Sequence, residues 1–285
     1  MKLIERNKCP VCFNQKYKSL YKISYNSEKL LNFLNEYYQK KVLIDLLKSD
    51  YYELLECDKC KLIFQKYIPD DEFSYMLYDE IISSEKSLKK KLFSSQNLNL
   101  KYDNQIRLIK NIYNNKEIKV LEFGAGWGFW ASRAIESGLN VDVFELSRSR
   151  IEYMKKKGIN VIEDLKESLD QYDFIYSDQT IEHISDPHQI FKSFLPNLKK
   201  GGFIFLGYPS SFMFKKKLKN SYIPKKDAAH PLEHINIFNR SSMVNLIKQY
   251  DLNLINFKSK FNPSFKNFLR DIKNLFYFDN ILIQK

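Results

Sequence analysis

Two cysteine pairs with Cys-x-x-Cys spacing lie in the N-terminal part of the chain. Cys9 and Cys12 form the first pair, and Cys57 and Cys60 form the second. Four thiolates in this spacing make a complete tetrahedral shell for Zn²⁺ and leave no position open for a substrate. All four cysteines of the chain belong to these pairs. We therefore expect a structural zinc site in a reducing compartment, with an iron–sulfur cluster or a redox dithiol as alternatives.

A glycine loop follows a short apolar stretch further along the chain. Residues 120–128 read Val-Leu-Glu-Phe-Gly-Ala-Gly-Trp-Gly, and such glycines let the backbone turn sharply and let a ligand approach closely. The Gly-x4-Gly-Lys-Ser/Thr pattern of a P-loop is absent. In a dinucleotide-binding loop a third glycine admits the pyrophosphate, and Phe129 takes that position here. The ligand class that remains is S-adenosylmethionine (SAM), which has no phosphate.

Two acids follow the loop at positions that suit a nucleoside. Glu145 closes the second expected strand, about 20 residues after the loop, where a carboxylate can bind both ribose hydroxyls. Asp164 follows the third expected strand, where an acceptor can meet the adenine amino group, and Glu163 competes for this role. Each acid could instead be a surface charge or an acid at a helix N-terminus.

Strands and helices that alternate from residue 118 onward must position these residues. This alternation predicts a doubly wound, mostly parallel sheet of seven strands, an α/β fold of the Rossmann-like type. We expect strands at 118–123, 141–145, 160–163, 172–177, 203–208, 252–258 and 280–284, and helices at 129–137, 148–157, 187–199, 241–250 and 264–276.

The chain divides into three expected parts. Residues 1–68 are predicted to form a small zinc-ribbon module with a helical insert at about 27–48. Residues 69–117 are polar and mostly helical in pattern, which suits a connector or lid. Residues 118–285 are predicted to form the cofactor-binding domain.

The amino-acid composition limits the classes of protein to which the chain can belong. Apolar residues make up 44% of the 285 residues, which is enough for one α/β core, and no apolar run approaches a membrane span. The N-terminus lacks the apolar region of a secretory signal, and we expect a cytoplasmic protein. The net charge of +12 suits an anionic partner, but lysine far outnumbers arginine, so a general lysine bias explains it as well.

Three motifs in order make residues 118–209 similar to class I SAM-dependent methyltransferases. The loop at 120–128 resembles the first motif of that family. The stretch 172–187, which contains Ile-Glu-His-Ile-Ser-Asp-Pro, resembles the fourth-strand motif, and Leu-Lys-Lys-Gly-Gly at 198–202 resembles the turn before strand five. By this resemblance SAM would contact Glu122, Gly124, Ala125, Gly126, Trp127, Glu145, Leu146, Asp164, Leu165, Asp178 and Gln179.

The cysteine pairs resemble the zinc ribbon of a methyltransferase subgroup associated with sugar and surface-polysaccharide modification. The stretch 233–238, Glu-His-Ile-Asn-Ile-Phe, is similar to a signature of the same subgroup. The resemblance implies a sugar acceptor, nucleotide-linked or within a glycan, and we expect O-methylation. The alternative is an RNA methyltransferase that holds nucleic acid with the ribbon and the lysine-rich stretch 214–219.

Histidine is the side chain best matched to remove a proton near neutral pH. His183 follows the fourth expected strand, at the edge where open α/β sheets bind ligands. His234 and His230 lie in the segment after the fifth strand, above the same edge. We predict these three as the candidate catalytic residues, although each could instead position a loop. His188 lies within an expected helix and is predicted to be only solvated.

Overall fold

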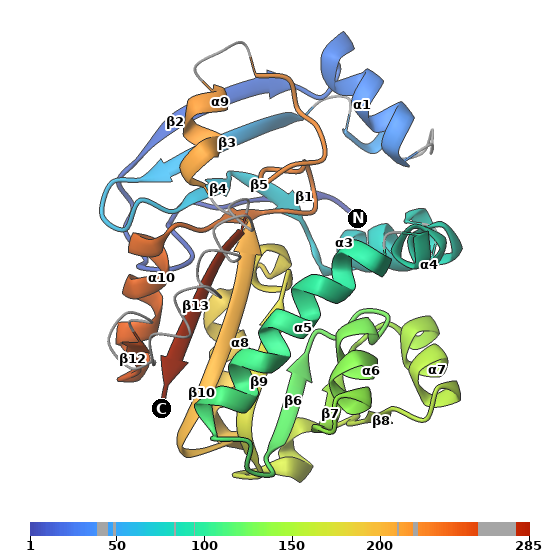
Figure 1. Ribbon diagram of the computed structural model, residues 1–285. Coiled ribbons are helices and arrows are strands. Elements are labelled where there is room, and N and C mark those ends of the chain that lie inside the picture. Colours follow the sequence, from blue (N-terminus) through green and yellow to red (C-terminus); the bar gives the residue numbers. More distant parts are fainter. Residues whose placement is uncertain are drawn as a thin grey trace.

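The computed structural model describes residues 1–38, 45–47, 50–82, 84–93, 95–209, 211–218, 222–255 and 278–285. Figure 1 shows a large sheet with helices on both faces, and a smaller sheet at one end of it. The N-terminal chain builds most of the smaller sheet, and the glycine-loop segment builds the larger one.

The larger sheet has seven strands in this part of the chain, in the order β12-β13-β10-β9-β6-β7-β8. Neighbouring strands are parallel except that β13 runs antiparallel to both β10 and β12. This confirms the predicted seven-stranded, mostly parallel sheet. The bounds are β6 (Lys119–Phe123), β7 (Asn140–Phe144), β8 (Asn160–Val161), β9 (Tyr172–Asp178), β10 (Leu198–Pro209), β12 (Asn253–Ile255) and β13 (Phe278–Gln284).

Both faces of this sheet are buried by helices. Along β6 and β9, Val120 and Phe174 pack on the helical face of α5, α6 and α7, whereas Leu121 and Ile175 pack on the face of α8 and α10. In Figure 1, α5 crosses in front of the strands. Apolar residues therefore occupy successive positions in these strands, as in other parallel sheets. The helices are α5 (Ser95–Ile112), α6 (Phe129–Glu136), α7 (Arg148–Lys156), α8 (Pro187–Phe194) and α10 (Arg240–Ile247).

The strand order reverses beside β6. The chain passes from β6 to β7 and β8 on one side, and then to β9 and β10 on the other. In open α/β sheets a ligand binds at such a reversal, outside the carboxyl ends of the strands. The glycine loop leaves β6 at this edge, and residues 178–183 leave β9 beside it.

The smaller sheet joins distant parts of the sequence. Its antiparallel order is β11-β4-β3-β2, so a strand from the C-terminal half completes a sheet begun near the N-terminus. A separate two-stranded sheet pairs β1 with β5. The boundaries at residues 68 and 117 stay a prediction. The strands are β1 (Leu3–Glu5), β2 (Tyr17–Ser24), β3 (Tyr51–Cys57), β4 (Ile63–Gln65), β5 (Tyr67–Pro69) and β11 (Asn236–Ile237).

Further helices lie in the N-terminal part of the chain and in the segment after β10. Of the expected insert at 27–48, residues 28–38 form α1 and residues 45–47 are helical, while the rest lies outside the described residues. The expected aromatic helix at 264–276 also lies outside them. None of the helices described is both long and apolar enough to cross a membrane. These helices are α1 (Glu28–Tyr38), α3 (Asp71–Met76), α4 (Ser84–Phe93) and α9 (Phe212–Leu218).

His188 fastens the first cysteine knuckle to the larger sheet. Its Nε2 lies 2.9 Å from the Val11 carbonyl oxygen, and its Nδ1 lies 2.9 Å from the Tyr250 hydroxyl. The Phe13 ring stacks on the imidazole at 4.9 Å between centroids. The expectation that His188 is only solvated was wrong, because the knuckle covers this face of α8.

We expect His188→Ala to lower the free energy of unfolding by about 2 kcal/mol, because it removes a buried hydrogen bond, a partly buried one and a ring contact. Denaturant unfolding measures this change. Gln189→Ala, at an exposed position of the same helix, is the matched control and should change stability little. Equal stability of the two variants would contradict this role of His188.

Candidate functional site

A cavity of about 1070 Å³ opens at the carboxyl edge of the larger sheet. The glycine loop and the end of β7 line one part of it. The turn after β9, the segment before β11 and aromatic residues from α1 and from residues 77–81 line another part. A cavity of this size exceeds what a single small ligand needs, so it has room for a cofactor and a second molecule.

The glycine loop has the backbone that its sequence predicts. Gly124 and Gly126 have φ values of +74° and +59°, in the region that favours glycine. A Cβ on Gly124 would lie 2.5 Å from Oγ1 of Thr180, in the turn after β9. The close approach of these two turns therefore requires glycine at this position.

Glu145 lines the cavity beside this loop. Its Oε2 accepts a hydrogen bond from the Gly126 amide at 2.7 Å, and its Oε1 accepts from the amides of Leu146 and Ser147 at 2.9 and 3.0 Å. A guanidinium nitrogen of Arg150 lies 3.8 Å from Oε2. These contacts fix the carboxylate at the end of β7, as its position in the sequence predicts.

Two further acids lie below the loop. Glu122 is buried, its Oε2 accepts a hydrogen bond from the Ala131 amide at 3.0 Å, and burial raises the pKa of its carboxyl well above the usual value. Asp178 forms an ion pair with Lys101 from α5, and both side chains are 11% exposed. Gly207 leaves the room that the Asp178 carboxylate occupies, since a Cβ there would overlap it. All of these acids line the cavity.

The predicted cofactor residues fall into two groups. Glu122, Gly124, Ala125, Gly126, Trp127, Glu145, Leu146, Asp178 and Gln179 all line the cavity. Asp164 and Leu165 do not. The Asp164 side chain is exposed and caps a short helix by accepting from the Lys166 amide at 2.9 Å, and Leu165 is buried in the core. Their contact with adenine stays a prediction.

Two of the three predicted histidines meet at the other part of the cavity. The ring centroids of His183 and His234 lie 4.8 Å apart. Burial lowers the pKa of His183 well below its usual value, and burial also lowers the pKa of His234, to about 4. Both imidazoles are therefore neutral at pH 7. His230 is fully buried behind Tyr38 and does not line the cavity.

Tyrosine hydroxyls surround these histidines. The Tyr78 hydroxyl lies 2.8 Å from Nδ1 of His183. The Tyr38 hydroxyl lies 2.9 Å from Oε1 of Glu233 and 2.9 Å from the Pro231 carbonyl oxygen. Burial raises the pKa of both hydroxyls well above their usual value, so both keep their protons.

Gln65 of β4 and Arg6, which follows β1, hold the histidine segment in place. The Gln65 amide nitrogen donates to the carbonyl oxygens of His230 and His234 at 2.9 and 3.0 Å. Arg6 donates to the Ile235 carbonyl oxygen at 2.6 Å and to Oδ1 of Asn236 at 2.8 Å. Gln65 and Arg6 therefore help to determine where His234 lies relative to the glycine loop.

Several of these residues carry no clear signal in the sequence. Tyr78 and Lys101 lie in the polar segment before the glycine loop, where tyrosines and lysines are so frequent that no single one is marked. Gln65 looks like an ordinary strand residue. Glu182, a buried residue next to His183, does have a signal in the sequence, because it belongs to the fourth-strand motif.

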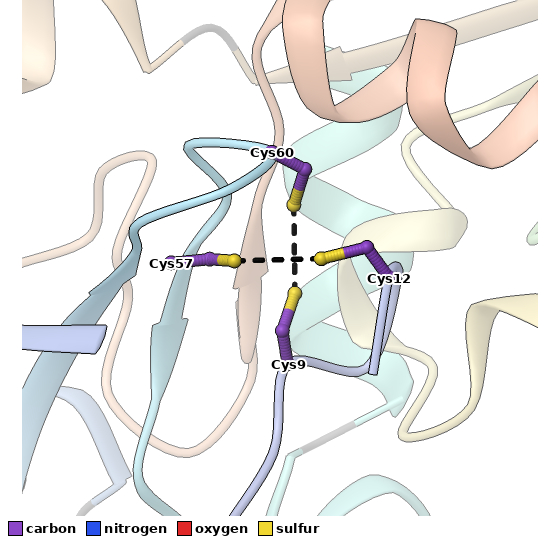
Figure 2. A group of neighbouring side chains, drawn as sticks. All are labelled: Cys9, Cys12, Cys57 and Cys60. Atoms are coloured by element: carbon purple, nitrogen blue, oxygen red, sulfur yellow. Dashed lines mark hydrogen bonds between the residues drawn. The ribbon is translucent and has the colours of Figure 1, made fainter. Parts of the chain in front are cut away.

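The four cysteine sulfurs converge from the two knuckles (Figure 2). The Sγ atoms of Cys9 and Cys60 are 3.5 Å apart, and those of Cys12 and Cys57 are 3.4 Å apart. A tetrahedral Zn²⁺ with Zn–S bonds of about 2.3 Å separates its sulfur ligands by about 3.8 Å. All four sulfurs lie within 4.8 Å of one another, so this donor set fits a closed, all-thiolate metal site.

Comparisons with known proteins give one family. A family model described as a methyltransferase domain matches residues 98–256, which is more than half of the chain. The match begins in α5 and ends beyond β12, so it includes the glycine loop, the turn after β9 and the histidine segment. No curated protein matches the sequence.

Solved methyltransferase structures share the fold. The plantazolicin methyltransferase BpumL, in complex with a pentazolic desmethylPZN analog and S-adenosylhomocysteine (SAH), is 12% identical, with a TM-score of 0.55 over 74% of this chain and 94% of that chain. The plantazolicin methyltransferase BamL, bound to a triazolic analog and SAH, gives the same values. A SAM-dependent methyltransferase from Mesorhizobium loti is 13% identical, with a TM-score of 0.43 over 59% of this chain and 91% of that chain. The family match, with the fold and the loop geometry, shows that the chain belongs to the methyltransferase-domain family and is a class I SAM-dependent methyltransferase.

Proposed function

We propose that the protein transfers the methyl group of SAM to a hydroxyl of a sugar, either nucleotide-linked or part of a glycan. The observation that carries this proposal is that one cavity contains both the glycine loop with Glu145 and the pair His183–His234. A donor held at the loop and an acceptor held at the histidines would lie in the same enclosed space. Methyl transfer needs mainly this positioning and the removal of one proton.

The residues beside the loop fit SAM. Glu145 lies where a carboxylate can accept from both ribose hydroxyls, and Glu122 and Asp178 lie below the loop. The positive φ values of the glycines let the ligand approach the backbone. When bound, SAM supplies an electrophilic methyl group on its sulfonium: the S–CH₃ bond breaks as the O–CH₃ bond forms, and the sulfur keeps the electron pair.

The histidines suit the acceptor end. Both are neutral at pH 7, so each has a lone pair that can take up a proton. Nδ1 of His183 lies 2.9 Å from the Glu233 carbonyl oxygen and 2.8 Å from the Tyr78 hydroxyl. Because the carbonyl oxygen can only accept, we assign the hydrogen to Nδ1 and the lone pair to Nε2. This hydrogen bond orients the ring of the base.

The surroundings of the histidines suit a sugar with an anionic group. Tyr37, Tyr38 and Tyr78 offer aromatic rings to a sugar, and Lys226 lines the same cavity. The RNA alternative has weaker support, because Lys215 is paired with Glu56 and Lys217 lies 3.8 Å from Asp227. Internal acids thus offset part of the charge that would attract a nucleic acid backbone.

We further propose that the four cysteines hold a structural zinc ion. The sulfur positions close the coordination shell, so the ion has no site for a substrate. Its role would be to hold together two knuckles whose residues pack on α8 and α10.

We expect Glu145→Gln to weaken SAM binding by at least about tenfold, because the neutral amide cannot accept from two ribose hydroxyls as a carboxylate does. Calorimetry with SAM measures the change. Glu152→Gln, at an exposed position of α7, is the matched control. An unchanged affinity in Glu145→Gln would show that the ribose lies elsewhere.

We expect His183→Asn and His234→Asn to lower methyl transfer to the acceptor by about 10²- to 10⁴-fold, since each removes a candidate base. SAM affinity should stay near wild type, because neither residue touches the glycine loop. The measurement is transfer of radiolabelled methyl from SAM to a panel of nucleotide-sugars and glycans. Full transfer rates in both variants would refute the assignment of the base.

We expect one zinc ion per chain by elemental analysis, and much less in Cys57→Ser, because the variant breaks the all-thiolate shell. Thermal unfolding of Cys57→Ser should also occur at a lower temperature. Lys59→Ser changes an exposed residue of the same knuckle and should keep the metal. Zinc-free wild-type protein with undiminished stability would rule this site out.

A further inference from the structure

Glu182 is a buried carboxylate beside the acceptor end of the cavity. It lies in the short helical turn Ile181–His183 that follows β9, and its exposed fraction is 0%. Neither of its carboxylate oxygens has a hydrogen-bond partner among the residues that the structure describes. Burying a carboxylate without partners is costly, and such groups are usually paired or bind a metal ion.

Two imidazoles face this carboxylate. Nε2 of His183 lies 3.9 Å from Oε1 of Glu182. Nδ1 of His234 is buried and likewise has no partner in the described part of the chain. One ligand atom from each of these three residues lies within 4.8 Å of the other two. The three side chains therefore converge on one point.

The orientation of His183 is that of a metal ligand. Its Nδ1 lies 2.9 Å from the Glu233 carbonyl oxygen and 2.8 Å from the Tyr78 hydroxyl. With the hydrogen assigned to Nδ1, the Nε2 lone pair is on the side of Glu182. Histidines that bind metals commonly donate their other ring hydrogen to a backbone carbonyl or carboxylate in this way. The backbone of His234 is held by Gln65, which donates to its carbonyl oxygen.

We propose that Glu182, His183 and His234 bind one divalent cation, separate from the cysteine site. One carboxylate and two imidazoles suit a first-row transition ion such as Mn²⁺, Fe²⁺ or Zn²⁺. Three protein ligands leave coordination positions open, and these face the cavity because His183 and His234 line it. Gln179 lies just before the turn Ile181–His183 and also lines the cavity.

This inference rests on the proposed function: it keeps methyl transfer to a hydroxyl at this end of the cavity, and it replaces the role of the two histidines as bases with a role as ligands. A hydroxyl bound to the cation would lose its proton to solvent water more readily, as metal-bound water does. The resulting oxygen then takes the methyl group as the S–CH₃ bond breaks. The histidines would bind the cation and thereby position the acceptor oxygen. Their replacement would therefore stop methyl transfer, as it would if they were bases.

Binding of Mn²⁺ to the zinc-loaded protein tests the proposal, and the electron paramagnetic resonance signal of free Mn²⁺ measures it. Mn²⁺ prefers oxygen and nitrogen ligands and should leave the thiolates occupied by zinc. We expect one Mn²⁺ per wild-type chain, and affinity at least about tenfold weaker in Glu182→Gln and in His234→Gln. Glu136→Gln, an exposed carboxylate on α6, should bind Mn²⁺ like wild type.

Two measurements keep the result interpretable. SAH affinity and thermal unfolding show whether each variant is folded, since the cofactor loop is intact in both. With SAM labelled with ¹³C in the methyl group, Mn²⁺ should broaden the methyl resonance in the wild type and not in Glu182→Gln. This broadening places the cation near the reacting carbon without requiring the acceptor.

Absence of Mn²⁺ binding in the wild type, or equal binding in folded Glu182→Gln, would overturn the proposal. If methyl transfer then persists in the presence of a chelator, the cation site fails while the proposed function stands. Failure of SAM itself to bind would count against the proposed function instead.

Discussion

The active site depends on the hydrogen bonds that Gln65 makes with the backbone of the histidine segment. This fully buried side chain in β4 donates to the carbonyl oxygens of His230 and His234, and its own oxygen lies 3.3 Å from the Leu232 amide nitrogen. The backbone N–H of Gln65 also donates to the Ile235 carbonyl oxygen, at 3.0 Å. Leu232 has a φ of +69°, a conformation that a leucine keeps only where its surroundings impose it.

The cavity is therefore the product of two sheets. The larger sheet supplies the glycine loop and the turn after β9, because parallel strands bring these segments to one edge. The smaller sheet supplies the segment with His234 and, through α1, the hydroxyl of Tyr38. A buried polar network of this kind is favourable only when its members are satisfied together. The need to satisfy this network explains why the N-terminal part packs against the methyltransferase fold and is not merely joined to it by the chain.

The methyltransferase fold could be predicted, and so could the position of the glycine loop and Glu145 at one cavity, because their signals are local. Gly124 and Gly126 need glycine for their own backbone, and Glu145 lies at a fixed distance in sequence from them. The acceptor end was only partly predictable. His183 and His234 are 51 positions apart in the sequence. The pairing of β11 with β4 and the hydrogen bond from Asn236 to the Ile184 carbonyl oxygen bring their segments together. Nothing near Gln65 or His188 in the sequence shows which backbone groups they hold.

The most direct test of a donor and an acceptor sharing one cavity is calorimetry on the purified protein. SAM would be titrated first, and a panel of nucleotide-sugars would then be titrated into the SAH-loaded form. We predict binding of SAM, and binding of a nucleotide-sugar by the SAH-loaded wild type that is lost in Tyr78→Ala, whose side chain lies at the acceptor end. Failure to bind SAM, or a sugar affinity unchanged in that variant, would contradict the account.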